Sequence, residues 1–290
     1  MNSKTTSWLF LLPAIAIYGF FGAIPIAQTF WISLTDQVGI PPGNFIGLQN
    51  YVELAQDEYF INSLKNTGIW VACFLVVPNA LAITIALLVK RTFWASGAIK
   101  TVFFLPLALS FAIVGVIWSW IYEPGVGLLD QLLTAMGLDF LIVEWLGPYA
   151  GNFSVIAAAA WRQTAFATVV FLAGLSAIPQ ELIEAAKVDG ATRRQLFFRI
   201  TLPLLKPAST IAVSSALIHA LLATEIVLTM TRGGPFGTTE VVGYRMYMET
   251  FWNYKFGYGA AIGVVVTMMT AVLVVPYVRR MAKAQEREWS

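Results

Sequence analysis

The chain has 290 residues, of which 58% are hydrophobic and 12% charged, and its formal net charge at pH 7 is +2. Soluble domains hold about half apolar and a quarter charged residues, so this composition excludes an ordinary soluble domain and indicates an integral membrane protein. The single cysteine, Cys73, lies in an apolar run, so one chain can form neither a disulfide framework nor a cysteine-based metal site.

Apolar runs of about the length that crosses a hydrocarbon core, roughly 20 residues, recur along the chain. We expect transmembrane helices at six of them: 8–33, 67–89, 101–122, 153–178, 207–230 and 258–278. The first run stays apolar from Trp8 to Leu34. It is longer than the apolar part of a signal peptide, about 7–15 residues, so we interpret it as a retained helix. The predicted fold is all-α, with 1–290 as a single transmembrane domain.

Basic residues are concentrated in the loops after the second, fourth and sixth runs. Outside the fourth-run loop they are Lys90, Arg91, Lys100, Arg279, Arg280, Lys283 and Arg287. The first two loops on the opposite side are mainly acidic. Because loops rich in lysine and arginine stay in the cytoplasm, we expect both termini to be cytoplasmic.

The loop after the fourth run, 179–206, begins like a helix. Pro179 suits a first turn, where its missing N–H costs nothing, and Glu181 faces the positive end of the helix dipole. Gly190 can adopt the left-handed conformation that closes a helix. These signals predict a helix over 179–189.

A second short helix is predicted after it. Thr192 and Gln195 fit a capping box, and Pro203 is expected to end the helix. The pair would form a helix-turn-helix along the membrane surface, suited to a docking groove. The alternative from the residues alone is an amphipathic surface loop with solvated charges.

Nothing in the sequence indicates nucleotide hydrolysis. A Gly-x-x-x-x-Gly-Lys-Ser/Thr segment is absent, and the glycine-rich stretch at 233–237 contains no lysine. We therefore expect no ATP hydrolysis, catalytic residue, metal or cofactor in this chain. A membrane-embedded enzyme is disfavoured because His219 has no histidine or cysteine companions.

Polar side chains within the apolar runs are candidates for a substrate pathway, because sugar hydroxyls need hydrogen bonds and sugar C–H faces stack on aromatic rings. In the fifth run, a three-to-four-residue spacing places five residues, four of them polar, on one helix face: Ser215, His219, Leu222, Glu225 and Thr229. The alternative is hydrogen bonding between packed helices.

Further pathway candidates lie in the third and fourth runs. They are Ser110, Trp161, Gln163 and Thr164. The alternative for Trp161, with Arg162, is a belt at the lipid headgroups. We predict that Asn79 instead satisfies backbone groups freed by Pro78.

The loop carries a pattern that resembles a known family. Glu184-Ala185-Ala186-x-x-Asp189-Gly190-Ala191, followed by Ile200-Thr201-Leu202-Pro203, resembles the EAA loop of binding-protein-dependent ABC importer permeases. Weaker landmarks occur in order along the chain, among them Gly47-Leu48-Gln49-Asn50-Tyr51 and Thr231-Arg232-Gly233-Gly234-Pro235. The Asp189-Gly190-Ala191 form resembles the carbohydrate-importer branch. The N-terminal landmarks are similar to the first permease of a maltose-type or glycerol-phosphate-type pair.

The resemblance implies a type I importer permease fold in a bacterial or archaeal inner membrane. Segment 179–206 would be the coupling loop that enters a cleft on a cytoplasmic ATPase. Glu184 would be the polar anchor, Ala185 and Ala186 would allow close contact, and Gly190 would set the turn between Asp189 and Ala191.

The implied partners are a second permease, two ATPase subunits that bind ATP and magnesium, and an extracytoplasmic binding protein, with no nucleic acid. The binding protein is expected to contact the outer segment 231–258. The cargo would be a carbohydrate or a related polyol or glycoside. Thr224-Glu225 stands where the family usually has Phe-Asp, so the role of that carboxylate stays open. The remaining alternative is an ion-coupled secondary transporter of a small polar solute.

Overall fold

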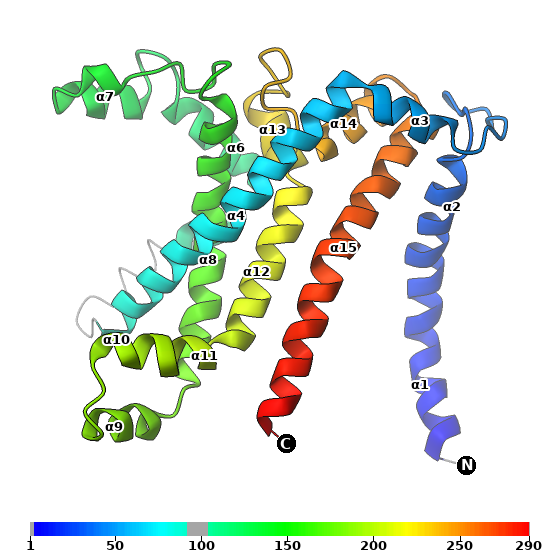
Figure 1. Ribbon diagram of the computed structural model, residues 1–290. Helices are drawn as coiled ribbons and strands as arrows, with labels where there is room; N and C mark the ends of the chain where they lie inside the picture. Colours follow the sequence, from blue (N-terminus) through cyan, green and yellow to red (C-terminus); the bar gives the residue numbers. More distant parts are fainter. Residues whose placement is uncertain (1–2, 92–103, 290) are drawn as a thin grey trace. The chain divides into compact units, whose positions relative to one another are not determined.

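Helices make up nearly all the regular structure in the computed structural model, which describes residues 3–91 and 104–289 (Figure 1). Within those ranges the only β-type pairing is an isolated bridge between Thr35 and Phe45. The predicted all-α class is therefore confirmed. The chain forms two compact units, one of residues 1–61 and 245–268 and the other of residues 62–244 and 269–290.

The first unit contains the N-terminal apolar helices. Its own elements are α1 (Ser3–Tyr18), the π-helix η1 (Gly19–Ala23), α2 (Ile24–Ile32), α3 (Gln49–Gln56) and the π-helix η5 (Met248–Trp252). The amide of Asn50 on α3 donates to the carbonyls of Ser33, at 2.8 Å, and Thr35, at 2.9 Å. These bonds hold the turn after α2 against α3.

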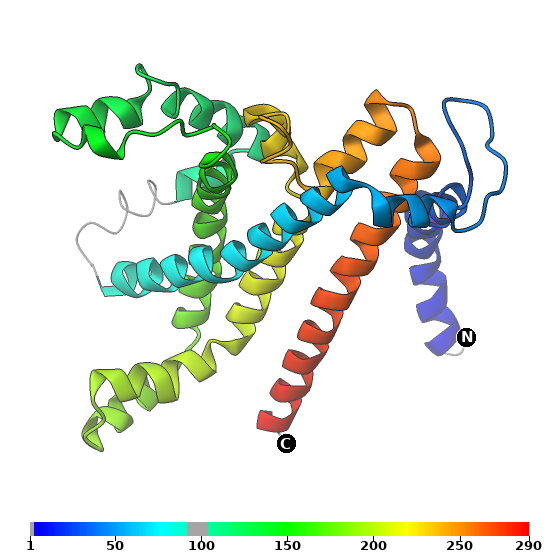
Figure 2. The ribbon, with the colours of Figure 1, turned by 45° about the horizontal axis from the view of Figure 1, so that its top comes forward.

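The second unit contains most of the remaining helices. Its elements are η2 (Leu105–Ala108), α6 (Phe111–Ile121), α7 (Leu128–Ala135), η3 (Asp139–Leu141), α8 (Gly151–Ser176), α9 (Gln180–Val188), α10 (Arg193–Gln195), the π-helix η4 (Leu196–Thr201), α11 (Leu202–Leu204), α12 (Lys206–Leu221) and α13 (Thr224–Met230). Three helices have residues in both units: α4 (Glu58–Arg91), α14 (Val242–Tyr247) and α15 (Phe256–Trp289). In the second unit, α8 packs against α12 and α6 (Figures 1 and 2).

Among the described residues, four helical stretches are long and apolar enough to cross a membrane. They are Leu11–Ile32, Glu58–Lys90, Gly151–Ser176 and Phe256–Arg280. A bent pair, Arg193–Leu204 and Lys206–Leu221, adds a fifth if it counts as one span. The predicted third span corresponds to η2 and the shorter apolar helix α6, while Lys100 and residues 101–103 lie outside the described residues.

The predicted fifth span is interrupted, so the expectation of one continuous helix over 207–230 was wrong. The backbone leaves the helical conformation at Leu222 (φ −108°, ψ 28°), and α13 starts at Thr224. The N–H of Thr224 donates to the carbonyl of Leu222 at 2.8 Å, which closes a tight turn. No glycine or proline marks this break, so apolar periodicity could not reveal it.

Pro78 lies inside α4 and removes one backbone donor from that helix. The Asn79 amide replaces it, donating to the carbonyls of Phe74 at 3.2 Å and Leu75 at 3.0 Å. The predicted role of Asn79 is therefore confirmed.

Small residues allow the helices of the second unit to pack closely in what we call the alanine cluster. Its buried members are Ala82 and Ala86 of α4, Ala167, Phe171 and Leu175 of α8, Ala208 and Ala212 of α12, and the loop residues Ile178 and Leu205. At Gly174 on α8, an added Cβ would lie 2.7 Å from the Cβ of Ala208, so only glycine permits this approach.

Candidate coupling segment and substrate pathway

The candidate coupling segment, residues 179–206, opens with the predicted helix, α9. Pro179 is extended (φ −57°, ψ 130°) at its N-cap, and Glu181 lies in the first turn. At the other end Gly190 has φ +80°, as predicted for a left-handed stop. The N–H of Gly190 donates to the Lys187 carbonyl at 3.1 Å, and that of Ala191 donates to the Ala186 carbonyl at 2.9 Å. This paired pattern is a Schellman motif, which fixes the direction in which the chain leaves α9.

The motif side chains of α9 lie largely on its surface. Glu184, Ala185 and Asp189 are exposed, whereas Ala186 and Ala191 are half-buried. The Glu184 carboxylate accepts a hydrogen bond from the Gln180 amide at 2.9 Å. The second carboxylate oxygen of Glu184 and the small side chains of Ala185 and Ala186 leave α9 able to accept a partner surface at close range.

The second half of the segment also starts as predicted. The Thr192 hydroxyl accepts from the Gln195 N–H, and the Gln195 side chain accepts from the Thr192 N–H, which completes a capping box. The expected end at Pro203 was wrong, because the helical path continues to Leu204 and breaks at Leu205. The π-helical turn of η4 places Pro203 at the start of the next helical turn, where a missing N–H is tolerated.

Apolar contacts attach the coupling segment to the helices behind it. Ile178, just before α9, and Leu205, just before α12, are buried members of the alanine cluster, and Ile183 of α9 packs against that cluster. The same cluster includes residues of α4, α8 and α12. α9 is therefore joined to three long helices by side-chain packing as well as by the chain itself.

A polar contact links α8 to α12 among the predicted pathway residues. Nδ1 of His219 lies 2.9 Å from Oε1 of Gln163 and 3.3 Å from Oγ of Ser215. Gln163 is fully buried, with 0% of its surface exposed. Within the described part of the chain, Nε2 of this buried amide has no hydrogen-bond partner. The structure thus brings three predicted candidates together.

The other candidates do not join this contact. The Thr164 hydroxyl donates to its own helix at the Ala160 carbonyl, and Ser110 caps α6 by accepting from the Ile113 N–H. The helix break at Leu222 puts His219 on α12 and Glu225 on α13. Our prediction that one continuous helix face carries both was therefore wrong. Thr224 is half-buried and Glu225 is exposed at the start of α13.

Arg162 lies beside this contact and was not predicted to belong to it. Its Nε donates to the Leu109 carbonyl at 2.6 Å, and its guanidinium carbon lies 4.4 Å from the ring centroid of Phe111. Phe111 in turn contacts the His219 ring edge-on at 5.2 Å. Trp161 packs edge-on against Trp118 of α6, at 5.9 Å. Leu109 is 53 residues from Arg162, so no local pattern could have revealed this pairing.

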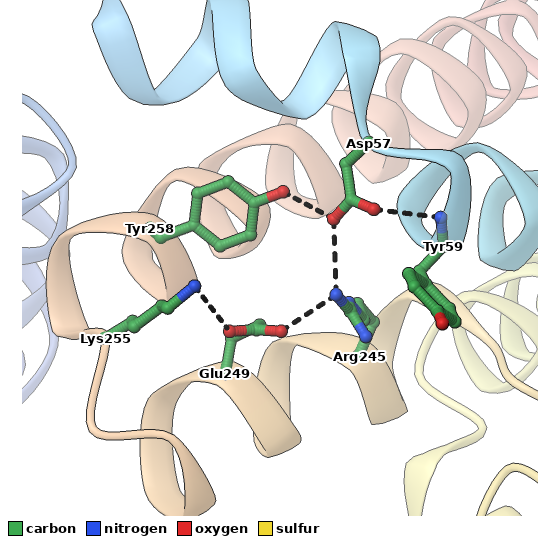
Figure 3. Close-up of polar contacts among 6 residues, drawn as sticks. All are labelled: Asp57, Tyr59, Arg245, Glu249, Lys255 and Tyr258. Atoms are coloured by element: carbon green, nitrogen blue, oxygen red, sulfur yellow. Dashed lines mark hydrogen bonds and ion pairs between the residues drawn. The ribbon is translucent and has the colours of Figure 1, made fainter.

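The first unit holds a separate ionic cluster that the sequence analysis missed (Figure 3). Nη2 of Arg245 lies 3.3 Å from Oδ2 of Asp57 and 2.9 Å from Oε1 of Glu249, and Lys255 is 3.9 Å from the other Glu249 oxygen. The Tyr258 hydroxyl donates to Asp57 at 2.6 Å, and the Tyr59 N–H donates to it at 2.9 Å. Glu249 is only 3% exposed, and Arg245 and Lys255 are the cations that pair with this buried carboxylate.

The Asp57 carboxyl is acidified by its surroundings. Burial raises its pKa, but the hydrogen bond from Tyr258 and the positive charge of Arg245 outweigh that effect, so the pKa lies below its usual range. Asp57 is thereby kept charged as the shared acceptor of the cluster.

These features define a multi-pass membrane permease with an exposed helical segment at 179–206. Residues 78–284 match the family described as the inner membrane component of binding-protein-dependent transport systems. The chain belongs to this family and is the permease component of an importer in the inner membrane. Such components are not catalytic and carry no cofactor, because ATP hydrolysis belongs to a separate subunit.

Similar proteins cover almost the whole chain. The trehalose/maltose transport system permease protein of Thermococcus litoralis is 34% identical over 273 residues, covering 93% of this chain and 90% of the relative. A bacterial ABC transporter involved in import of the acidic polysaccharide alginate matches with a TM-score of 0.83 at 25% identity, covering 97% and 96% of the two chains. The alginate transporter in complex with a pentasaccharide-bound periplasmic protein gives a TM-score of 0.81 at 26% identity, covering 94% of this chain and 93% of that chain.

Proposed function

We propose that this permease pairs with a second, similar permease to form the pathway by which a carbohydrate, or a related polyol or glycoside, enters the cytoplasm. Two relatives support this cargo class, since one is described as a trehalose/maltose permease and another as an alginate importer. The buried Gln163 amide nitrogen adds physical support, because an unpaired donor beside the pathway candidates suits a hydroxyl-bearing substrate.

Two copies of an ATPase subunit supply the energy in this proposal, and an extracytoplasmic binding protein delivers the cargo. α9 enters a cleft on one ATPase copy, with Glu184 as the polar anchor. The positively charged loops lie in the cytoplasm, together with both termini. When ATP closes the ATPase pair, α9 is displaced, and the pathway opens outward to receive the cargo. Hydrolysis of the ATP resets it.

The observation that carries this proposal is the packing of Ile183 against the alanine cluster. Closely packed interiors transmit a displacement because they switch between discrete arrangements and do not deform smoothly. The cluster contains residues of α8 and α12, the two helices that also hold Gln163 and His219. A displacement of α9 is therefore transmitted to α8 and α12, the helices that carry Gln163 and His219.

The test compares two substitutions on the same helix in the assembled importer. Ile183→Ala removes the contact with the cluster, whereas Leu182→Ala changes a side chain that is 48% exposed. We expect Ile183→Ala to retain the ATPase subunits but to lower uptake about tenfold and weaken substrate stimulation of ATP hydrolysis, because it removes the side-chain packing that joins α9 to the cluster. Leu182→Ala should change uptake less than twofold. Equal uptake by both variants would show that α9 does not act through this contact.

A further inference from the structure

A large cavity lies beside α9, and none of the proposed transport steps uses it. It has a volume of about 1180 Å³, is partly open, and is lined by the ends of α4 and α8 and by α9, α10 and η4. All its lining residues belong to the second unit, and the helices α4, α8, α9 and α10 that carry many of them are labelled in Figure 1. The cavity therefore sits where two predicted membrane spans meet the coupling segment.

The charged residues that line the cavity are all basic. They are Lys90 of α4, Lys187 of α9 and Arg193 of α10. Among the described residues no acidic side chain lines it, although the exposed Glu184 accepts a hydrogen bond from the lining residue Gln180. Three cations around one cavity without a lining acid favour an anionic ligand.

Lys90 is fixed in position within this cavity wall. Its Nζ donates to the Leu175 carbonyl at the end of α8, at 2.7 Å. This bond uses one of the three ammonium donors, which leaves the charge itself uncompensated by a lining carboxylate. Lys187 of α9 and Arg193 of α10 line the same cavity, so a ligand bound there would meet cations from three helices.

The rest of the lining is mainly apolar. Leu87, Ile183, Leu196 and Phe197 are half-buried there, and Ile178 is buried. A free inorganic phosphate would gain nothing from these side chains. A phospholipid would use both parts, its headgroup against the cations and the upper acyl chain against the apolar wall.

We propose that this cavity binds an anionic phospholipid, with the phosphate between Lys187, Arg193 and Lys90. Basic pockets between membrane helices on the cytoplasmic side are suited to anionic headgroups. The bound lipid would connect α9 and α10 to α4 at the membrane surface. The site shares Ile183 and Lys187 with the α9 helix of the proposed mechanism, but its test measures lipid binding and not transport.

The experiment measures lipid binding directly by native mass spectrometry of the purified importer complex, with phosphatidylglycerol titrated against phosphatidylcholine. The test variant is Lys187→Gln with Arg193→Gln. The matched control is Arg194→Gln with Arg199→Gln, which removes the same charge from the same segment outside the cavity. We expect the test variant to lower the affinity for phosphatidylglycerol about tenfold or more, and the control to lower it less than twofold.

Competition with inorganic phosphate in millimolar excess distinguishes a phospholipid headgroup from free phosphate as the ligand of the cavity. It should leave the bound phosphatidylglycerol in place, because it lacks the apolar part that the cavity accommodates. Displacement by phosphate at these concentrations would show that the cavity takes a soluble anion and would overturn the lipid assignment. Equal loss of lipid in the test and control variants, or no loss in either, would overturn the site itself.

Discussion

Nδ1 of His219 lies 2.9 Å from Oε1 of Gln163, and this hydrogen bond joins α12 to α8. The bond uses one end of a fully buried amide and leaves the other end, Nε2, without a partner in the described ranges 3–91 and 104–289. A buried amide that used only one of its groups for packing would be costly. We infer that a substrate hydroxyl accepts a hydrogen bond from Nε2 of Gln163 as it passes, which would offset this cost.

Replacing Gln163 with Leu should therefore impair transport more than stability. Hydrogen bonds between membrane helices contribute on average about 0.6 kcal/mol, so the complex should assemble and melt within a few degrees of the wild type. Loss of a hydrogen bond to the substrate should raise the KM for uptake about tenfold. Uptake kinetics in proteoliposomes and the Tm of the complex provide the two measurements.

The neighbouring Thr164 provides the control for this substitution. Its hydroxyl bonds only to the Ala160 carbonyl of its own helix, at 2.7 Å, and it is equally part of the buried face of α8. Thr164→Val should leave KM within twofold of the wild type. Should both variants raise KM alike, the effect would come from the buried polarity of α8, and Gln163 would have no specific role.

Gly190→Val tests the turn that ends α9. Gly190 has φ +80°, and nothing lies within 4 Å of where its Cβ would be. The cost is thus confined to the backbone, about 1–2 kcal/mol for a side chain in the left-handed region and more for a β-branched one. We expect α9 to lose its fixed exit direction, with uptake and substrate-stimulated ATP hydrolysis both reduced about tenfold while membrane insertion is retained.

Gly137→Val is the matched control, since Gly137 has φ +70° and equally open surroundings but follows α7, outside the coupling segment. It carries a similar backbone strain and should transport normally. Normal uptake by Gly190→Val would contradict the coupling role of this turn, and equal impairment of both variants would point to general destabilisation.

The features that could be predicted from sequence are those that depend on residues close together in the chain. The ends of α9, the capping box of Thr192 and Gln195, and the replacement of the Pro78 donor by Asn79 all involve atoms within five residues of one another. Local backbone chemistry alone determines them. The apolar run lengths likewise predicted the membrane class and the longest helices.

The features that could not be predicted join distant parts of the chain. The Trp70 indole donates to Asn152, 82 residues away, and Arg162 reaches Leu109 across 53 residues. Arg162 beside Trp161 has the composition of a headgroup belt, which the sequence left open as the alternative to a pathway role. The break at Leu222 was hidden for another reason, since its turn uses residues that are all compatible with a helix.

Asp57→Asn tests the ionic cluster of the first unit, in which Arg245 links Asp57 to Glu249 (Figure 3). Asparagine keeps the size of the side chain and can still accept from Tyr258, but it removes the negative charge facing Arg245. We expect a loss of about 1–3 kcal/mol in unfolding free energy, the usual contribution of a hydrogen bond to a charged group. The adjacent, exposed Glu58 provides the control, and Glu58→Gln should change the stability by no more than about 0.5 kcal/mol.

The same substitution should change the pH dependence of stability. Because the folded-state pKa of Asp57 lies below its unfolded value, its contribution is fully present above the unfolded pKa and is lost as pH falls through the folded one. For aspartate the upper limit of this window is about pH 4. Thermal melts of the detergent-solubilised complex from pH 7 to pH 3 should show wild type and Asp57→Asn converging below that limit. A constant difference in Tm over the whole range would mean that the Asp57 charge does not contribute to the stability of the cluster.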